Sequence, residues 1–285
     1  MTKRMSNDSI PPEFMAKQSQ ETVEIDEDGV MANLFADHED GSSAIDEFEN
    51  VTIAGQVYKL KLPPDVGTLF AHRVWSGSKL LANYLATNAE KLVKNRKTIE
   101  FGAGSALPSL VALAQGSSFT MITDYPDSQI LQAIRETVGM NWMTCDDPKG
   151  RVRVLGHEWG TDVDDLISCL PSNPSELETY HRSYFDLAIL SECLWMHRCH
   201  QALAASLDKI LHPTHGVAIL TYAHHIPGLE KDDDAFFDIC ERYHGLRIIQ
   251  KTSHEMEYMW DSSKTITVFL VLLDRVSGDI KKNCT

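Results

Sequence analysis

Seven short apolar runs alternate with segments of helical period along the chain, and this alternation restricts the possible folds more than any other feature. The runs have the length of buried strands, and the segments between them repeat apolar residues every three or four positions. Strands that alternate with helices form a mostly parallel sheet covered by helices on both faces. The sequence therefore predicts an α/β fold with strands at 98–101, 119–123, 152–155, 185–190, 217–221, 246–250 and 265–273.

The same pattern predicts the helices and an extension in front of the sheet. Two β-type runs at 51–53 and 57–62 are joined by Ala54 and Gly55, which indicates an N-terminal β-hairpin. The segment 171–183 is polar, contains two prolines, and is expected to be an irregular surface connection. Helices are expected at 76–86, 108–115, 128–138, 164–170, 200–211 and 233–243.

The acidic residues are concentrated at the N-terminus. The formal net charge is −15, and residues 1–50 contain 13 acidic residues against Lys3, Arg4 and Lys17. A segment with so few apolar residues cannot bury enough surface to offset the entropy lost on ordering. We therefore expect a largely flexible acidic leader at 1–45 and a single domain at 46–285, whose residues 46–75 form the extension.

Charge and cysteine usage restrict the partners and the compartment. An acidic chain is repelled by phosphate backbones and by anionic lipid headgroups, so nucleic acid and membrane surfaces are not expected partners. The six cysteines form no C-x-x-C pair, and the N-terminus lacks a secretory signal pattern, so reduced thiols in the cytoplasm, or in the nucleus, are expected. No pattern in the sequence indicates an oligomeric state.

A glycine-rich turn follows the first predicted strand of the sheet. The run 99–105 ends a strand, passes through Gly102 and Gly104, and opens a helix, so a ligand could approach its backbone closely. Asp124 ends the next strand, where a carboxylate can accept hydrogen bonds from the hydroxyls of a ribose. Together the turn and Asp124 indicate a site for an adenosine-containing cofactor.

Two residues favour S-adenosylmethionine over a dinucleotide. A pyrophosphate site needs a third glycine at position 107, where this chain has Leu107. Glu100 adds a negative charge beside the turn, which suits a ligand that carries a sulfonium and an amino group. S-adenosylmethionine is therefore the expected cofactor.

Four motifs give the chain a specific resemblance. The segments 100–108 (EFGAGSALP), 123–127 (TDYPD), 158–160 (EWG) and 190–197 (LSECLWMH) occur in this order. Together they resemble the fungal nicotinamide N-methyltransferase-like family, which includes lysine methyltransferases of elongation factor one-alpha. The resemblance implies a seven-stranded, Rossmann-like class I methyltransferase sheet. It covers most of the domain, but Glu192 stands where the family usually has aspartate, which puts the substrate in doubt.

The resemblance also implies roles for individual residues. Glu100 and the glycine turn would shape the methionine pocket, Asp124 would hold the ribose, and Tyr125 and Trp159 would flank the adenine. Trp75 would cover the cofactor from the N-terminal side. The complete set of expected cofactor residues is Trp75, Glu100, Gly102, Ala103, Gly104, Ser105, Asp124, Tyr125, Trp159 and Ser191.

The acceptor is expected at the end of the fourth strand, where ligands of open α/β sheets bind. Glu192 could orient an amine or receive its proton, and Trp195 and Tyr222 could supply aromatic walls. The histidines at 197, 200, 224 and 225 show no spacing that brings four ligands together, so no metal is expected.

These features favour an S-adenosylmethionine-dependent N-methyltransferase. Two acceptors are open at this point, a small-molecule amine or amide and a protein lysine. The alternative is a protein of the same fold that binds the cofactor but acts as a non-methylating catalyst or a regulatory partner, since fold alone does not establish chemistry.

Overall fold

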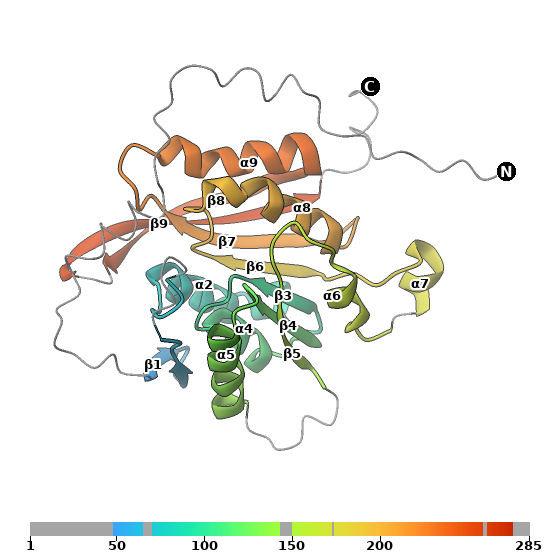
Figure 1. Cartoon of the computed structure of the whole chain (residues 1–285), viewed down its shortest axis with the longest axis horizontal. Coiled ribbons are helices and arrows are strands. Elements are labelled where there is room, and N and C mark those ends of the chain that lie inside the picture. Colours follow the sequence, from blue (N-terminus) through green and yellow to red (C-terminus); the bar gives the residue numbers. More distant parts are fainter. Residues whose placement is uncertain (1–47, 65–69, 143–149, 173, 259–260, 276–285) are drawn as a thin grey trace.

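The structure is a computed structural model that describes residues 48–64, 70–142, 150–172, 174–258 and 261–275. The expected leader at 1–45 lies outside the described residues. A seven-stranded sheet forms the centre of the molecule, running from β8 and β9 at the top of Figure 1 to β5 at the bottom. Its order is β5 (Val152–Gly156), β4 (Phe119–Asp124), β3 (Lys97–Phe101), β6 (Leu187–Ser191), β7 (Val217–Ala223), β9 (Asp261–Arg275) and β8 (Leu246–Tyr258).

The direction of the strands confirms the predicted fold class. The strands β5, β4, β3, β6 and β7 are parallel, whereas β9 is antiparallel to both of its neighbours. The described helices are α2 (Ser76–Thr87), α3 (Ala89–Leu92), α4 (Leu107–Ala114), α5 (Ser128–Asn141), α6 (Asp164–Ser168), α7 (Pro174–Tyr180), α8 (His200–Ile210) and α9 (Glu230–His244), together with the short 3-10 helix η3 (His197–Cys199).

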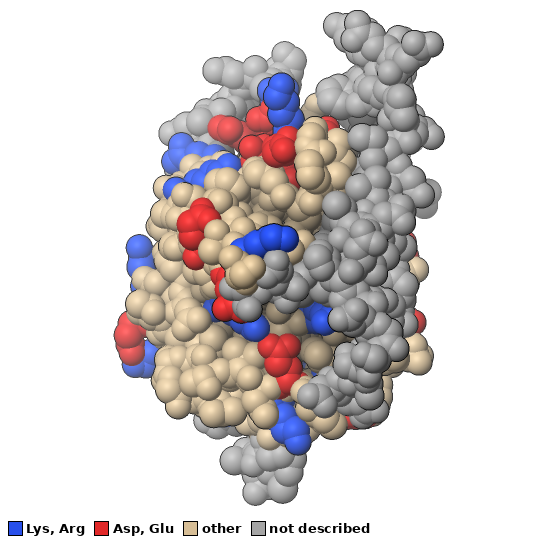
Figure 2. All heavy atoms as spheres, turned by 90° about the vertical axis from the view of Figure 1, so that its left-hand side faces the viewer, with Lys and Arg blue, Asp and Glu red and all other residues tan. Residues whose placement is uncertain are grey.

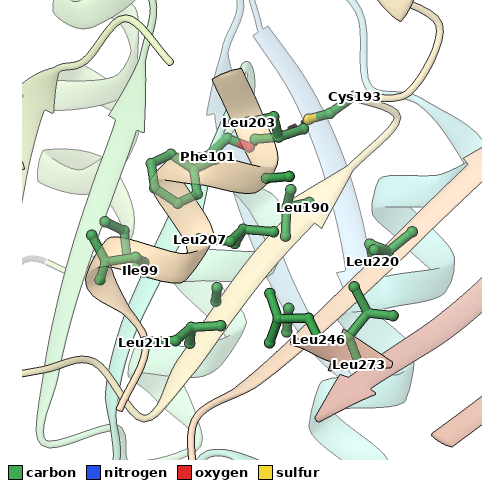
Figure 3. Packing of buried hydrophobic residues seen from close by; sticks show 14 of the residues in the cluster. Ile99, Phe101, Leu190, Cys193, Leu203, Leu207, Leu211, Leu220, Leu246 and Leu273 are labelled. Atoms are coloured by element: carbon green, nitrogen blue, oxygen red, sulfur yellow. Dashed lines mark hydrogen bonds between the residues drawn. The ribbon is translucent and has the colours of Figure 1, made fainter. Parts of the chain in front are cut away.

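Helices cover both faces of the sheet, because neighbouring residues of a strand point to opposite faces. On β6, Ala188 and Leu190 belong to a core with apolar residues of α6, α8 and α9. Figure 3 shows Leu190 together with Leu203 and Leu207 of α8 in this core. Leu187 and Ile189 belong to a second core with α2 and α4. A strand buried on both faces must be apolar throughout, which explains the continuous runs in the sequence.

The N-terminal hairpin is confirmed and is fixed to the domain. Strands β1 (Phe48–Ile53) and β2 (Gln56–Lys61) are antiparallel. Both turn residues between them have positive φ, as two-residue hairpin loops require. The side chain of Asn141 on α5 bonds both backbone groups of Lys59, and Thr137 does the same for Lys61.

Two parts of the chain differ from the prediction. Strands β8 and β9 are 13 and 15 residues long, because their polar outer halves pair with each other beyond the end of β7, where no apolar run is needed. Figure 1 shows this hairpin extending past the other strands. The segment 171–183 contains α7, so it is not an irregular connection. Among the described residues, no helix is both long enough and apolar enough to cross a membrane.

Candidate functional site

A cavity of about 630 Å³ lies at the carboxyl ends of β3, β4 and β6. This is the edge where open α/β sheets bind ligands. Most of the expected site residues line this single cavity, and Glu100 and Tyr222 are the two that do not. The lining includes Trp75, Gly102, Ala103, Gly104, Ser105, Asp124, Tyr125, Trp159, Ser191, Glu192 and Trp195.

The glycine turn brings bare backbone to the cavity. Gly102 has φ +60° and Gly104 has φ +49°, a region that side chains strongly disfavour. A Cβ atom on Gly102 would lie 2.9 Å from Sγ of Cys193 and 3.2 Å from the ring of Trp159. The turn therefore needs glycine at position 102 for space as well as for conformation.

Asp124 contacts the glycine turn directly at one end of the cavity. Its Oδ2 accepts a hydrogen bond from the Gly104 amide at 2.7 Å, and its Oδ1 accepts one from the Tyr125 amide at 2.7 Å. Burial raises the pKa of Asp124 to about 6, although the two amide donors oppose this shift. The turn and the carboxylate thus meet at one point, as the spacing of 20 residues indicated.

Glu100 lies behind the turn and not on the cavity wall. Its Oε2 accepts a hydrogen bond from the Ser109 amide in the first turn of α4 at 3.0 Å, while Oε1 is buried without a protein partner. Burial raises the pKa of Glu100 to about 8, and the bonds from Ser109 oppose the rise. The geometry makes Glu100 an anchor of the turn, with one oxygen still able to accept a bond.

Two aromatic residues border the side of the cavity next to β4 and β5. Trp159 contacts Gly102, and part of its ring packs against the core. Tyr125 is 48% exposed, so it lies at the rim. Behind Trp159, His157 packs against Phe101, and burial lowers the pKa of His157. A planar, partly apolar ligand can enter between the two aromatic side chains.

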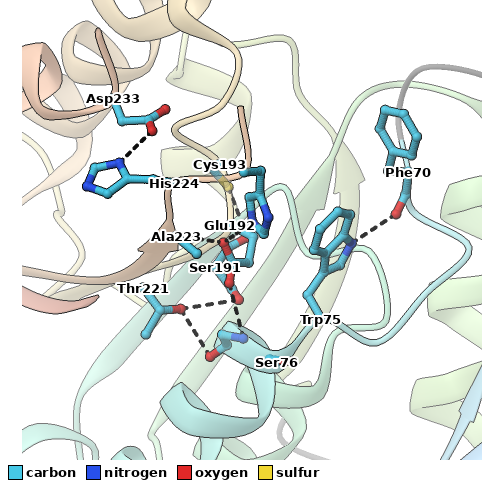
Figure 4. A network of polar contacts seen from close by, with 12 residues as sticks. Phe70, Trp75, Ser76, Ser191, Glu192, Cys193, Thr221, Ala223, His224 and Asp233 are labelled. Atoms are coloured by element: carbon cyan, nitrogen blue, oxygen red, sulfur yellow. Dashed lines mark hydrogen bonds and ion pairs between the residues drawn. The ribbon is translucent and has the colours of Figure 1, made fainter. Parts of the chain in front are cut away.

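A second aromatic group closes the opposite side of the cavity. Phe70 packs edge-on against Trp195 and Trp75, with ring centroids 5.6 Å and 6.4 Å away. The indole Nε1 of Trp75 donates a hydrogen bond to the Phe70 carbonyl at 3.1 Å (Figure 4). Phe70 was assigned no place in the site from the sequence, because its role depends on Trp75 and Trp195.

Glu192 reaches the same side of the cavity with a fully positioned carboxylate. Oε1 accepts a bond from the Gly77 amide at 3.1 Å, and Oε2 accepts from the Ala223 amide at 3.1 Å. His225 Nε2 lies 3.0 Å from Oε2, and Figure 4 shows Glu192 beside Ala223. Sequence reasoning selected Glu192, whereas it considered His225 only with the other histidines and did not connect it to Glu192.

Tyr222 is separated from the cavity, contrary to its expected position. Because neighbours on a strand point to opposite faces, Thr221 and Ala223 face α2 while Tyr222 packs under α9. Its hydroxyl donates a hydrogen bond to Asp234, and its ring stacks on Phe269. The aromatic wall therefore contains Trp195 without Tyr222.

His197, His200 and His224, as well as Cys193, have structural partners within the protein. Asp233 bonds His197 at 2.7 Å and His224 at 2.8 Å, and His200 Nε2 lies 2.6 Å from the Leu194 carbonyl. Within the described ranges, no three His, Cys, Asp or Glu side chains converge as metal ligands. Burial raises the pKa of the Cys193 thiol, so this group stays protonated.

Comparison with known proteins assigns the chain to a family. Residues 56–243 match the model of the family described as lysine methyltransferase. Similar proteins include the "Protein N-terminal and lysine N-methyltransferase" EFM7 of Emericella nidulans, 28% identical over 68% of this chain and 73% of the relative. The same protein of Candida glabrata is 35% identical over 61% of this chain and 63% of the relative. That of Gibberella zeae is 30% identical over 66% of this chain and 70% of the relative.

Solved structures support the same fold. The S-adenosylmethionine-dependent methyltransferase of Agrobacterium tumefaciens superposes with a TM-score of 0.51 at 13% identity, over 82% of this chain and 72% of that one. A protein assigned as a methyltransferase and crystallised with S-adenosylhomocysteine gives a TM-score of 0.53 at 12% identity, over 80% and 56%. The cavity lined by the glycine turn, Asp124 and Trp159 could hold such a cofactor. The chain belongs to the lysine methyltransferase family and is a class I, S-adenosylmethionine-dependent N-methyltransferase.

Proposed function

We propose that this protein transfers a methyl group from S-adenosylmethionine to an amino group of a protein, either a lysine side chain or an N-terminal amine. The observation that carries the proposal is the contact between Gly104 and Asp124 at one end of a cavity whose other end presents Glu192 between aromatic walls. The names of the relatives, which describe N-terminal and lysine methylation, support a protein acceptor.

The cofactor would occupy the end of the cavity next to β3 and β4. Each oxygen of Asp124 accepts one amide bond and keeps a second lone pair, so the carboxylate can also accept the ribose hydroxyls. Trp159 and Tyr125 would flank the adenine. The methionine portion would follow the glycine turn, with the buried charge of Glu100 behind the turn favouring its ammonium group. Ala103, Ser105 and Ser191 would complete this lining, whereas Trp75 packs with Phe70 and Trp195 on the acceptor side.

The acceptor would enter between Phe70, Trp75 and Trp195. Aromatic faces and a carboxylate attract a cationic amine, which then has to lose a proton before it can react. When bound, S-adenosylmethionine supplies a methyl group on a positively charged sulfur. A neutral nitrogen can attack this methyl group and displace the sulfur. The protein's part is to hold that nitrogen in line with the methyl group and to exclude water, so positioning accounts for most of the catalysis.

Charge supports a protein acceptor over nucleic acid. On the described part of the face in Figure 2, Lys and Arg are interspersed with Asp and Glu among uncharged residues, and the formal net charge of the chain is −15. A chain of net negative charge is repelled by phosphate backbones. The four described cysteines are free thiols, which supports the cytoplasm or the nucleus as the compartment.

A labelling experiment tests the proposal. The protein is incubated with methyl-labelled S-adenosylmethionine and a cell extract, one half of which has its protein amines blocked by acetylation. We expect label in the protein fraction of the untreated half and little in the blocked half. Label confined to small molecules would replace the protein acceptor with a small amine or amide. No transfer to either fraction, with cofactor binding intact, would favour the non-methylating alternative.

A further inference from the structure

His225 is a buried histidine whose ring bonds the carboxylate beside the proposed acceptor entrance. Its side chain is 6% exposed, that of Glu192 is 3% exposed, and the two are 3.0 Å apart. The ring of His225 also packs edge-on against Trp75, with centroids 5.1 Å apart. His225 therefore touches two residues of the proposed acceptor entrance at once.

The hydrogen bonds of Glu192 leave one direction open. A carboxylate offers about four acceptor positions. Oε2 receives the Ala223 amide and the His225 ring, and Oε1 receives the Gly77 amide. One position on Oε1 is left, and Glu192 lines the cavity. With His225 and Ala223 occupying Oε2, the carboxylate can offer an acceptor amine only this remaining position.

Glu192 also connects the entrance to helix α2. The amide of Gly77 belongs to the first turn of α2, where helix geometry provides no acceptor, and the carboxylate fills that role from 115 residues away. A Cβ on Gly77 would lie 2.2 Å from Oε1, so glycine is required for this contact. Trp75 is the N-cap of the same helix, so Glu192 and Trp75 both adjoin the first turn of α2.

His224, which precedes His225, anchors the end of β7 on its other side. His224 bonds Asp233 on α9, and Asp233 also bonds His197, so the end of β7 is tied to α9 and η3. His224 and His225 follow the last residue of β7, and their side chains bond different partners, which leaves His225 to face Glu192. The bond from His224 to Asp233 thus fixes the backbone from which His225 reaches Glu192.

We propose that His225 is a positioning residue for methyl transfer, which holds the Glu192 carboxylate and Trp75 so that the acceptor amine meets one open position on Oε1. The inference rests on the proposed function, because it assumes that an amine enters beside Glu192. It assigns His225 an effect on acceptor use and none on cofactor binding, since its ring contacts Glu192 and Trp75, which lie on the acceptor side of the cavity.

Two variants separate positioning from folding. His225→Leu removes the ring N–H, and His225→Gln keeps an N–H donor at a similar distance from the backbone. The matched control is His215→Leu. His215 bonds Asp186 at 3.1 Å at the opposite ends of β6 and β7, and the side chain of His215 is 54% exposed. For each variant, the S-adenosylmethionine dissociation constant is measured by titration, and labelling of extract protein is measured over a dilution series.

We expect His225→Leu to raise the half-saturating acceptor concentration by about tenfold or more, the size of one lost buried hydrogen bond. The cofactor dissociation constant should change less than twofold. His225→Gln should recover most of the loss, and His215→Leu should match the wild type. An unchanged acceptor dependence in His225→Leu, or an equal loss of cofactor affinity, would overturn the positioning role.

A second measurement needs no acceptor, so it distinguishes failure of this inference from failure of the proposed function. Hydrogen exchange at the Gly77 amide reports the position of Glu192, its partner. We expect exchange at Gly77 to be about tenfold faster in His225→Leu and close to wild type in His225→Gln. If the rate is the same in all three proteins, His225 does not hold Glu192, whatever the enzyme methylates.

Discussion

The two halves of the cavity are built in different ways. The cofactor half consists of the glycine turn at 102–104, Asp124 and Trp159, which follow three adjacent parallel strands. The acceptor half consists of Phe70, Trp75, Glu192, Trp195 and His225, whose segments lie far apart in the sequence. The first half presents the backbone of the turn, one carboxylate and one aromatic ring at successive strand ends. The second half brings together side chains from separate segments, which are held by backbone groups and by His225.

This difference implies that the halves can be changed separately. Backbone conformation fixes the cofactor half, so a Cβ atom in the wrong place should abolish binding. Side-chain contacts fix the acceptor half, and a change there should alter acceptor use while cofactor affinity stays the same. Enzymes that share a cofactor but differ in substrate require this kind of separation.

The largest effect is expected at the glycine turn. Gly102→Val places a branched side chain at positive φ and against Cys193 and Trp159. We expect the affinity for S-adenosylmethionine to fall about 100-fold or more, with loss of methyl transfer, measured by calorimetric titration. Circular dichroism serves as the folding control. Near-normal affinity in a folded Gly102→Val protein would contradict the proposed cofactor half.

The next effect is expected in the acceptor half. Gly77→Ala leaves a helical backbone intact, but its Cβ would collide with Oε1 of Glu192. We expect acceptor use to fall about 30-fold as Glu192 and Trp75 move, while the cofactor dissociation constant stays within twofold. Steady-state rates at varied acceptor concentration provide the measurement. A parallel loss of cofactor affinity would show that the halves are coupled.

A smaller effect is expected from pH, and only in the cofactor half. In the empty protein, burial raises the pKa of Glu100 to about 8 and that of Asp124 to about 6. A cationic cofactor with hydroxyl donors favours both ionised forms, so binding should release protons and tighten by about tenfold between pH 6 and 8.5. Titration in buffers with different ionisation enthalpies measures this release. Proton uptake on binding would contradict the assignment.

The same raised pKa values lower the free energy of unfolding as the pH rises, although they make cofactor binding tighter over the same range. Because the folded-state pKa of Glu100 is raised, the folded chain holds a proton that the unfolded chain releases above its ordinary pKa. The stability of the empty protein should therefore fall as the pH rises from about 5 to about 8. Saturation with the cofactor should offset the fall. Thermal melts across this range, with and without cofactor, provide the comparison.

The smallest effect on catalysis is expected at Tyr222, which lies outside both halves. Tyr222→Phe removes the hydroxyl that bonds Asp234 and keeps the ring. We expect turnover within twofold of the wild type and a stability loss of about 1 kcal/mol. Denaturant unfolding and initial rates test the two expectations. A tenfold loss of turnover would return Tyr222 to the catalytic role that its position in the sequence suggested.

The comparison also explains what the sequence could predict. Gly102, Gly104 and Asp124 were found because a strand end, a turn and a fixed spacing carry the geometry locally. His225 was missed because its role depends on Glu192 and Trp75, which no local pattern connects to it. The alternation of a strand could have placed Tyr222 on the face opposite Thr221. The length of β8 and β9 had no apolar signal, since their outer halves are polar.

The most direct test of the two-part cavity is titration of S-adenosylmethionine into the wild type, Asp124→Ala and Gly77→Ala. Asp124→Ala leaves the Gly104 and Tyr125 amides without their carboxylate partner. We expect one cofactor site in the wild type, an affinity at least about 30-fold weaker in Asp124→Ala, and wild-type affinity in Gly77→Ala. No binding by the wild type, or equal affinity in the wild type and Asp124→Ala, would contradict the assignment of the cofactor to this cavity.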